Sequence, residues 1–104
     1  KLVMPDFAER FVVRYVNSIT VTDLLAKHAV SKLDLLHIDA EGYDFEILKM
    51  FDFRETQPAV ILFESEHLSA EDYQACLSLL KKAGYRIFFR DGHDTIALTS
   101  TEFL

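Results

Sequence analysis

The segment Leu33–Asp44, with the sequence LDLLHIDAEGYD, constrains the fold of this chain more than any other stretch. Its apolar run, Leu33–Ile38, is typical of a strand that is buried on both faces of a parallel sheet. A short acidic turn containing Gly42 follows. A helix is then expected from Tyr43 to Phe51, because carboxylates in its first turn suit the positive end of a helix. The segment therefore predicts a strand, a tight turn and a helix in direct succession.

The same alternation of apolar strands and amphipathic helices continues along the chain. The other expected elements are a strand or extended arm at 11–16, a helix at 20–28, a strand at 59–63, a helix between Ser69 and Gly84, and strands at 85–89 and 95–99. Strands joined through helices should be parallel, whereas the last two strands are joined by a loop too short for a parallel crossover. The sequence predicts an α/β fold whose mixed sheet has parallel strands and one antiparallel final strand, flanked by helices.

Composition narrows the class of protein. With 104 residues the chain is one domain or part of a larger one, and 50% hydrophobic residues are sufficient for a core. It has no apolar run of about 18 residues and no signal-peptide pattern, so no membrane association is expected. The net charge of −6 argues against a nucleic-acid partner. The single Cys76 excludes an internal disulfide and is typical of a reducing, cytoplasmic location.

Several motifs together resemble the FkbM family of S-adenosylmethionine-dependent methyltransferases. That family has a Thr-Leu-Asp-x-Leu-Leu-like helix, an Ile-Asp-Leu-Leu-Lys-Ile-Asp-x-Glu-Gly strand and turn, and a helix of the Glu-x-x-x-Leu-Lys type. The matching stretches here are Thr22–Leu25, Leu33–Gly42, Glu46–Lys49 and the following strand Pro58–Glu64. The resemblance covers residues 19 to 99. One departure is His37, which stands where the family usually has Lys.

The resemblance implies a Rossmann-like class I methyltransferase fold, of which this chain would be the carboxyl-terminal half. The half that would grip S-adenosylmethionine begins with a strand and a Gly-rich turn, but the three glycines of this chain form no Gly-x-Gly cluster. Residues 1–104 are therefore interpreted as a single partial domain, the carboxyl-terminal half of such an enzyme. The full-length enzyme would use S-adenosylmethionine, whereas this chain alone is expected to bind it weakly and to be inactive.

Asp39 and Glu41 are the candidate catalytic residues, because ligands of open α/β sheets bind just outside the carboxyl ends of the strands. A carboxylate there can orient a hydroxyl acceptor, take its proton, or hold a divalent cation. The alternative is structural: Asp39 could instead cap the next helix or accept hydrogen bonds from the turn amides. Gly42 is expected to serve the turn itself, with a positive φ.

Other polar residues near the same edge are candidates for binding the acceptor. They are His37, Tyr43, Glu64, Glu66 and His67. If their strands are adjacent, the last three would face the same crevice as Asp39 and could hold a metal. Each also has a plainer interpretation: His37 as a hydrogen-bonded strand residue, Tyr43 as packing, and the residues after the second strand as a solvated acidic loop.

Two functions from different classes remain open. The leading one is a portion of a methyltransferase, directed at an oxygen of a small-molecule acceptor. The alternative is a non-catalytic α/β module that acts through self-association or partner binding. Its basis is the strand Leu33–Ile38, which in the resembled fold lies in mid-sheet beside the first strand of the missing half. Here that edge has no partner in the sequence and would invite strand addition by another chain.

Overall fold

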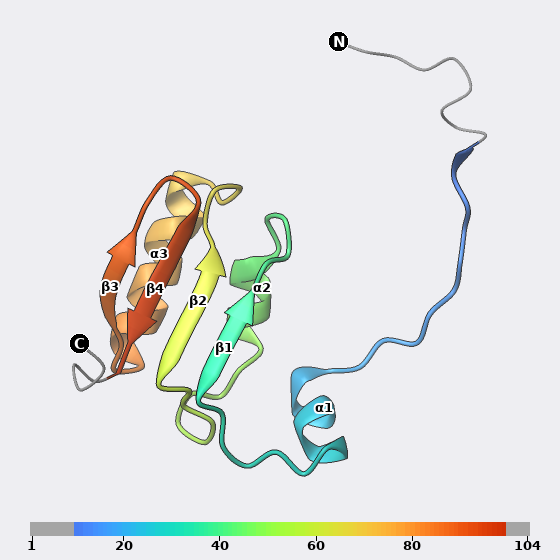
Figure 1. Cartoon of the computed structure of the whole chain (residues 1–104), viewed down its shortest axis with the longest axis horizontal. Helices are drawn as coiled ribbons and strands as arrows, with labels where there is room; N and C mark the ends of the chain where they lie inside the picture. Colours follow the sequence, from blue (N-terminus) through green and yellow to red (C-terminus); the bar gives the residue numbers. More distant parts are fainter. Residues whose placement is uncertain (1–9, 100–104) are drawn as a thin grey trace.

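The computed structural model of the chain describes residues 10–99 and shows an α/β arrangement in the order expected. The elements are α1 (Val21–Lys27), β1 (Leu35–Ile38), α2 (Asp44–Lys49), β2 (Val60–Glu64), α3 (Ala70–Lys82), β3 (Arg86–Arg90) and β4 (Asp94–Leu98). Residues 11–20 form an extended arm without strand pairing, which leads away from the sheet (Figure 1). Of the two alternatives predicted for 11–16, the extended arm is the one observed.

The four strands form one mixed sheet in the order β1-β2-β4-β3 (Figure 1). β1 and β2 are parallel, with Ile38 opposite Phe63, and β4 is antiparallel to both β2 and β3. The prediction of parallel strands with one reversed final strand is confirmed. β4, the last strand among the described residues, lies between β2 and β3 and is thus an interior strand of the sheet.

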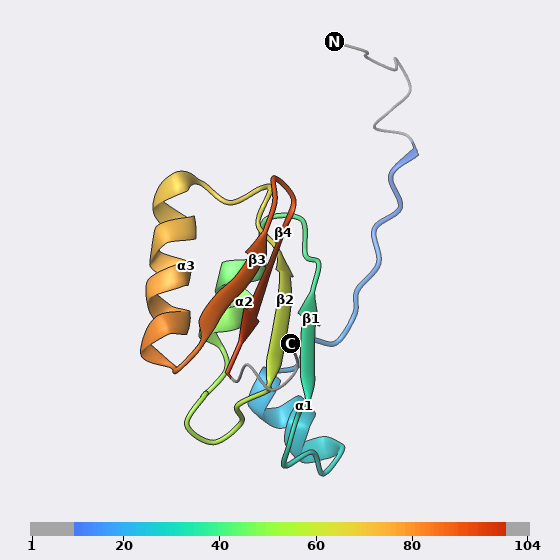
Figure 2. The same ribbon diagram turned by 60° about the vertical axis from the view of Figure 1, so that its left-hand side comes forward.

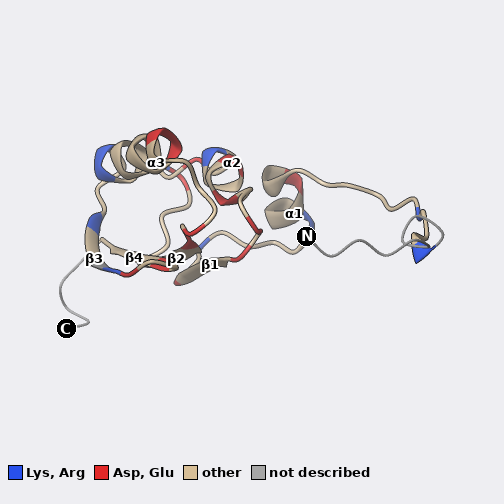
Figure 3. Cartoon of the chain, turned by 90° about the horizontal axis from the view of Figure 1, so that it is seen from above, with Lys and Arg blue, Asp and Glu red and all other residues tan. Residues whose placement is uncertain are grey.

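Within residues 10–99, helices cover only one face of the sheet. α2 and α3 lie together on that face, as the view from above and the rotated view both show (Figures 2 and 3). The core between the helices and this face is apolar and includes Leu48, Phe63 and Leu80, all fully buried. Transfer of such side chains from water is the main favourable contribution to folding. In the part of the chain that is described, the fold therefore has two layers, the sheet and the helices on one of its faces.

This arrangement corrects the prediction that Leu33–Ile38 is buried on both faces. In β1 only Ile38 is buried, and Leu35 remains 56% exposed. The reason is that β1 is an edge strand and that no helix covers the second face within residues 10–99. A continuous apolar run is compatible with burial of a strand on both faces, but it does not show that a second layer is present to cover it.

The helices begin and end where capping chemistry predicts. The hydroxyls of Thr20 and Ser69 accept hydrogen bonds from the backbone N–H groups three residues later, which opens α1 and α3. Gly84, with φ of +95°, follows α3 and ends it as expected. The apolar stripe of α3 is buried and includes Cys76, whose pKa is raised to about 12 by burial. In α1, by contrast, no residue is buried.

No helix within residues 10–99 has the length and apolar character needed to span a membrane.

The open edge of β1 predicts self-association, because an unpaired apolar strand edge is a template for strand addition. We expect light scattering to report a dimer or larger species for the wild-type chain. Leu35→Lys, which puts a charge at this edge, should shift the distribution towards monomer, whereas Phe88→Lys on the exposed part of β3 should not. A wild-type chain that stays monomeric at high concentration would contradict the prediction.

Candidate functional site

The carboxyl ends of β1 and β2 meet at one edge of the sheet and bring Asp39 beside Glu64. The two strands are parallel and in register, so both end at the same level. Side chains alternate along each strand: Ile38 and Phe63 face the helices, and the neighbouring positions face the other way. Asp39 and Glu64 follow these two residues directly and lie in hydrogen-bonding contact. The expectation that the two strand ends share one edge is confirmed.

A tight turn between β1 and α2 carries Glu41 out over this edge. Tyr43 N–H donates to the Ala40 carbonyl at 3.1 Å, and both central residues have positive φ, +50° at Glu41 and +103° at Gly42. Two successive residues with positive φ are the pattern of a type I′ turn, in which glycine is strongly preferred at the second position. A Cβ built at Gly42 would lie 3.4 Å from Cβ of His67. The predicted role of Gly42, a turn residue with positive φ, is confirmed, and His67 lies beside it.

Asp44 fixes this edge, a role that the sequence analysis did not predict. Its side chain is fully buried, and its two carboxylate oxygens accept hydrogen bonds from the backbone N–H groups of Ala40 and Glu64, each at 3.2 Å. One carboxylate therefore joins the turn after β1 to the end of β2. The available signal was an acidic residue at a helix start, which the sequence analysis assigned only to the helix dipole.

This role of Asp44 bears on the cap interpretation of Asp39. In the structural alternative, Asp39 caps the helix or accepts hydrogen bonds from the turn amides; one of these amides, that of Ala40, donates to Asp44 instead. The N-cap of α2 is Tyr43, which makes no side-chain capping hydrogen bond. Asp39 itself is exposed. Its carboxyl group is thus left to face Glu64 and solvent.

Glu64 is the most perturbed acid at this edge. A hydrogen bond between its carboxyl group and that of Asp39 is the main cause that raises its pKa, to about 7; burial and the charges of Asp39 and Glu41 act in the same direction, and His67 opposes them. Such a bond requires one shared proton, because two carboxylates have no donor between them. Oε1 of Glu64 is buried and has no hydrogen-bond partner. Near neutral pH this pair can therefore either hold or release a proton.

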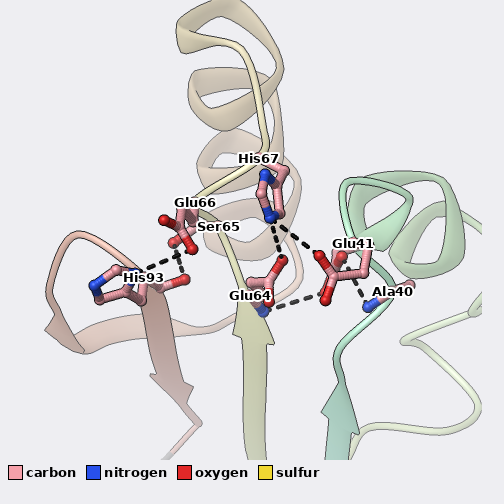
Figure 4. Close-up of polar contacts among 8 residues, drawn as sticks. Ala40, Glu41, Glu64, Ser65, Glu66, His67 and His93 are labelled. Carbon is pink, nitrogen blue, oxygen red and sulfur yellow. Dashed lines mark hydrogen bonds and ion pairs between the residues drawn. The ribbon is translucent and has the colours of Figure 1, made fainter. Parts of the chain in front are cut away.

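His67 links the turn to the end of β2 (Figure 4). Its Nε2 lies 3.1 Å from Oε2 of Glu41 and 3.5 Å from Oε1 of Glu64. The side chain of Glu64 is 14% exposed, whereas those of His67 and Glu41 are 48% and 76% exposed. The three groups thus form a cluster that is closed at Glu64 and open to solvent at Glu41.

The remaining candidates do not all join this cluster. Glu66 turns towards the β3–β4 hairpin, where its carboxylate lies 3.1 Å from Nδ1 of His93 and raises the pKa of that imidazole (Figure 4). His37 lies on β1 two residues before Asp39 and is exposed, and Tyr43 is 56% exposed. The packing alternative for Tyr43 therefore does not describe its position.

A family model described as the methyltransferase FkbM domain matches residues 5–87, which is most of the 104 residues. The chain belongs to the FkbM methyltransferase family. The match includes α1, the strand β1 with its acidic turn, and the helix α2, the elements on which the resemblance was based. Searches of curated proteins and of solved structures gave no significant match.

Membership in this family implies S-adenosylmethionine as a cofactor, and the residues present fit only part of that molecule. The carboxylates of Asp39 and Glu41 complement its cationic sulfonium and ammonium groups. Close approach of backbone to a ligand needs glycines, however, and the two glycines with positive φ among the described residues serve the acidic turn and the end of α3. The described residues therefore present no glycine-rich turn at which the backbone could approach this cofactor closely.

Replacement of Asp44 should loosen the whole edge. In Asp44→Asn one of the two acceptor oxygens becomes an amide that faces a backbone N–H, so a buried hydrogen bond is lost. We expect the free energy of unfolding to fall by about 2 kcal/mol, measured by urea denaturation. Asp34→Asn, at a 90% exposed side chain just before β1, is the control and should change stability little. Equal effects of both substitutions would contradict the bridging role.

The raised pKa of Glu64 predicts a pH dependence of stability. A carboxyl group whose pKa rises from 4.5 to about 7 on folding stabilises the folded state at low pH, and this contribution is lost as pH rises through 7. In chelator-treated buffer, the free energy of unfolding should fall between about pH 5 and about pH 8, and Glu64→Gln should remove most of that decline. Glu55→Gln, at an exposed position, should keep the wild-type profile. An unchanged profile in Glu64→Gln would show that this group does not titrate as described.

Proposed function

We propose that this chain forms the acceptor side of an S-adenosylmethionine-dependent methyltransferase directed at oxygen, within a Rossmann-like class I fold. The observation that carries the proposal is the position of Asp39: it is exposed at the carboxyl end of β1, beside Glu64, and the amide of the next residue, Ala40, donates to Asp44. Membership in the FkbM family supports methyl transfer as the activity.

Transfer of a methyl group to oxygen requires that the acceptor hydroxyl be held in line and lose its proton. Asp39 would orient the hydroxyl and accept this proton. Its hydrogen bond with Glu64 places a second carboxyl group beside the one that takes the proton. Glu41 extends over the same edge from the turn, and His37 and Tyr43 are exposed nearby in sequence for contacts with a small-molecule acceptor.

The family match favours this function over a non-catalytic module. Self-association through the β1 edge is compatible with either and stays a prediction. A cytoplasmic location likewise stays a prediction, which rests on the single Cys76. In this proposal the 104 residues form a partial domain, and the glycine-rich turn that grips the cofactor would come from a different segment.

The test is transfer of a labelled methyl group from S-adenosylmethionine to a panel of hydroxylated sugars, small metabolites and peptides. We expect weak cofactor binding and no transfer by this chain alone, and transfer when the chain is joined to a glycine-rich cofactor-binding half. In the joined protein, Asp39→Asn should lower kcat by roughly 10²-fold or more. His93→Gln is the control at the neighbouring hairpin and should leave kcat unchanged.

Two results would contradict the proposal. One is a joined protein that binds the cofactor but methylates no hydroxyl in the panel. The other is full activity in Asp39→Asn, which would show that this carboxylate neither orients the acceptor nor takes its proton.

A further inference from the structure

Three potential metal ligands from three different segments converge at the acidic edge. Glu41 comes from the turn after β1, Glu64 from the end of β2, and His67 from the loop before α3. One ligand atom of each lies within 4.8 Å of the others, and the two contacts of His67 Nε2 are 3.1 and 3.5 Å (Figure 4). Donors that share a cation at roughly 2.1 Å must lie about 3 to 4 Å apart. The cluster therefore needs only small side-chain movements to enclose an ion.

A second observation at the same place is a buried carboxylate oxygen. Oε1 of Glu64 is one of the atoms of the cluster, and it is buried without a hydrogen-bond partner. A buried oxygen of this kind costs free energy unless a donor or a cation satisfies it. His67 lies 3.5 Å away but does not form a hydrogen bond with it. A cation between the three groups would satisfy this oxygen directly.

The backbone conformation at Glu41 also helps to form the cluster, although it is unfavourable in free energy. Glu41 has φ of +50°, which is uncommon for a residue other than glycine and unfavourable in free energy. Gly42, with φ of +103°, continues this turn, and His67 lies beside it. The hydrogen bonds that Asp44 accepts hold the ends of β1 and β2 together. The three ligands are thus positioned by structure around them and not only by attraction to one another.

We propose that Glu41, Glu64 and His67 bind a divalent transition-metal cation such as Mn²⁺ or Zn²⁺. The imidazole distinguishes the site from one for Mg²⁺, which prefers oxygen ligands throughout. Three protein ligands leave coordination positions open to solvent on the side of Glu41, which is 76% exposed. If the proposed function is correct, an acceptor hydroxyl would take one of these positions beside Asp39 and have its pKa lowered by the cation.

The experiment titrates Mn²⁺ alone into the chelator-treated chain and follows the binding by electron paramagnetic resonance and by water-proton relaxation. We expect one ion per chain, competition by Zn²⁺, much weaker competition by Mg²⁺, and relaxation enhancement from water in the open positions. His67→Gln and Glu41→Gln should each weaken binding by at least about tenfold. Both residues are substantially exposed, so these variants should fold, and circular dichroism checks this.

The chain provides a matched control in its second His–Glu pair. His93 and Glu66 lie 3.1 Å apart on the same edge but are not part of the three-residue cluster. His93→Gln should bind Mn²⁺ as the wild type does. Absence of binding, binding unaffected by His67→Gln, or equal loss in His67→Gln and His93→Gln would each overturn the proposal. Because neither cofactor nor acceptor is present, these results are separate from any failure of methyl transfer.

Discussion

The two hydrogen bonds accepted by the buried carboxylate of Asp44 are the interaction on which the acidic edge depends. They connect the amide of Ala40, just after β1, with the amide of Glu64, at the end of β2. Charge-assisted hydrogen bonds are stronger than neutral ones, and a buried carboxylate requires such partners. By satisfying these amides, Asp44 sets the spacing of the two strand ends and leaves the carboxyl groups of Asp39 and Glu64 to face each other.

Local sequence signals predicted most of the fold. The caps at Thr20 and Ser69, the positive φ of Gly42 and the reversed last strand depend on short-range chemistry or on loop length, and each is present. Burial of β1 on both faces was predicted wrongly, because an apolar run says nothing about whether a second layer exists. The chain places helices on one face only in the part that is described, and Leu35 stays exposed as a result.

The position of the candidate site was predicted from the sequence, but the contacts between several of its side chains were not. Parallel strands end at one edge, so the proximity of Asp39 and Glu64 followed from the topology. The sequence could not show that Glu66 pairs with His93, because this contact depends on how the β3–β4 hairpin folds back over the loop after β2. Nor could it show that His67 reaches Glu41, which depends on how the loop before α3 lies beside the turn after β1. Such contacts are set by tertiary geometry, to which residue spacing gives no access.

The left-handed backbone conformation of Glu41 lowers the stability of the fold, although it places a carboxylate at the acidic edge. Glycine or asparagine would adopt this backbone at lower free energy than glutamate does. A search for thermostable variants would therefore select against the carboxylate at position 41, and the sturdier protein would have lost a negative charge from its acidic edge. At this single residue, a substitution that raises the stability of the fold would lower the capacity of the edge to bind cations or protons.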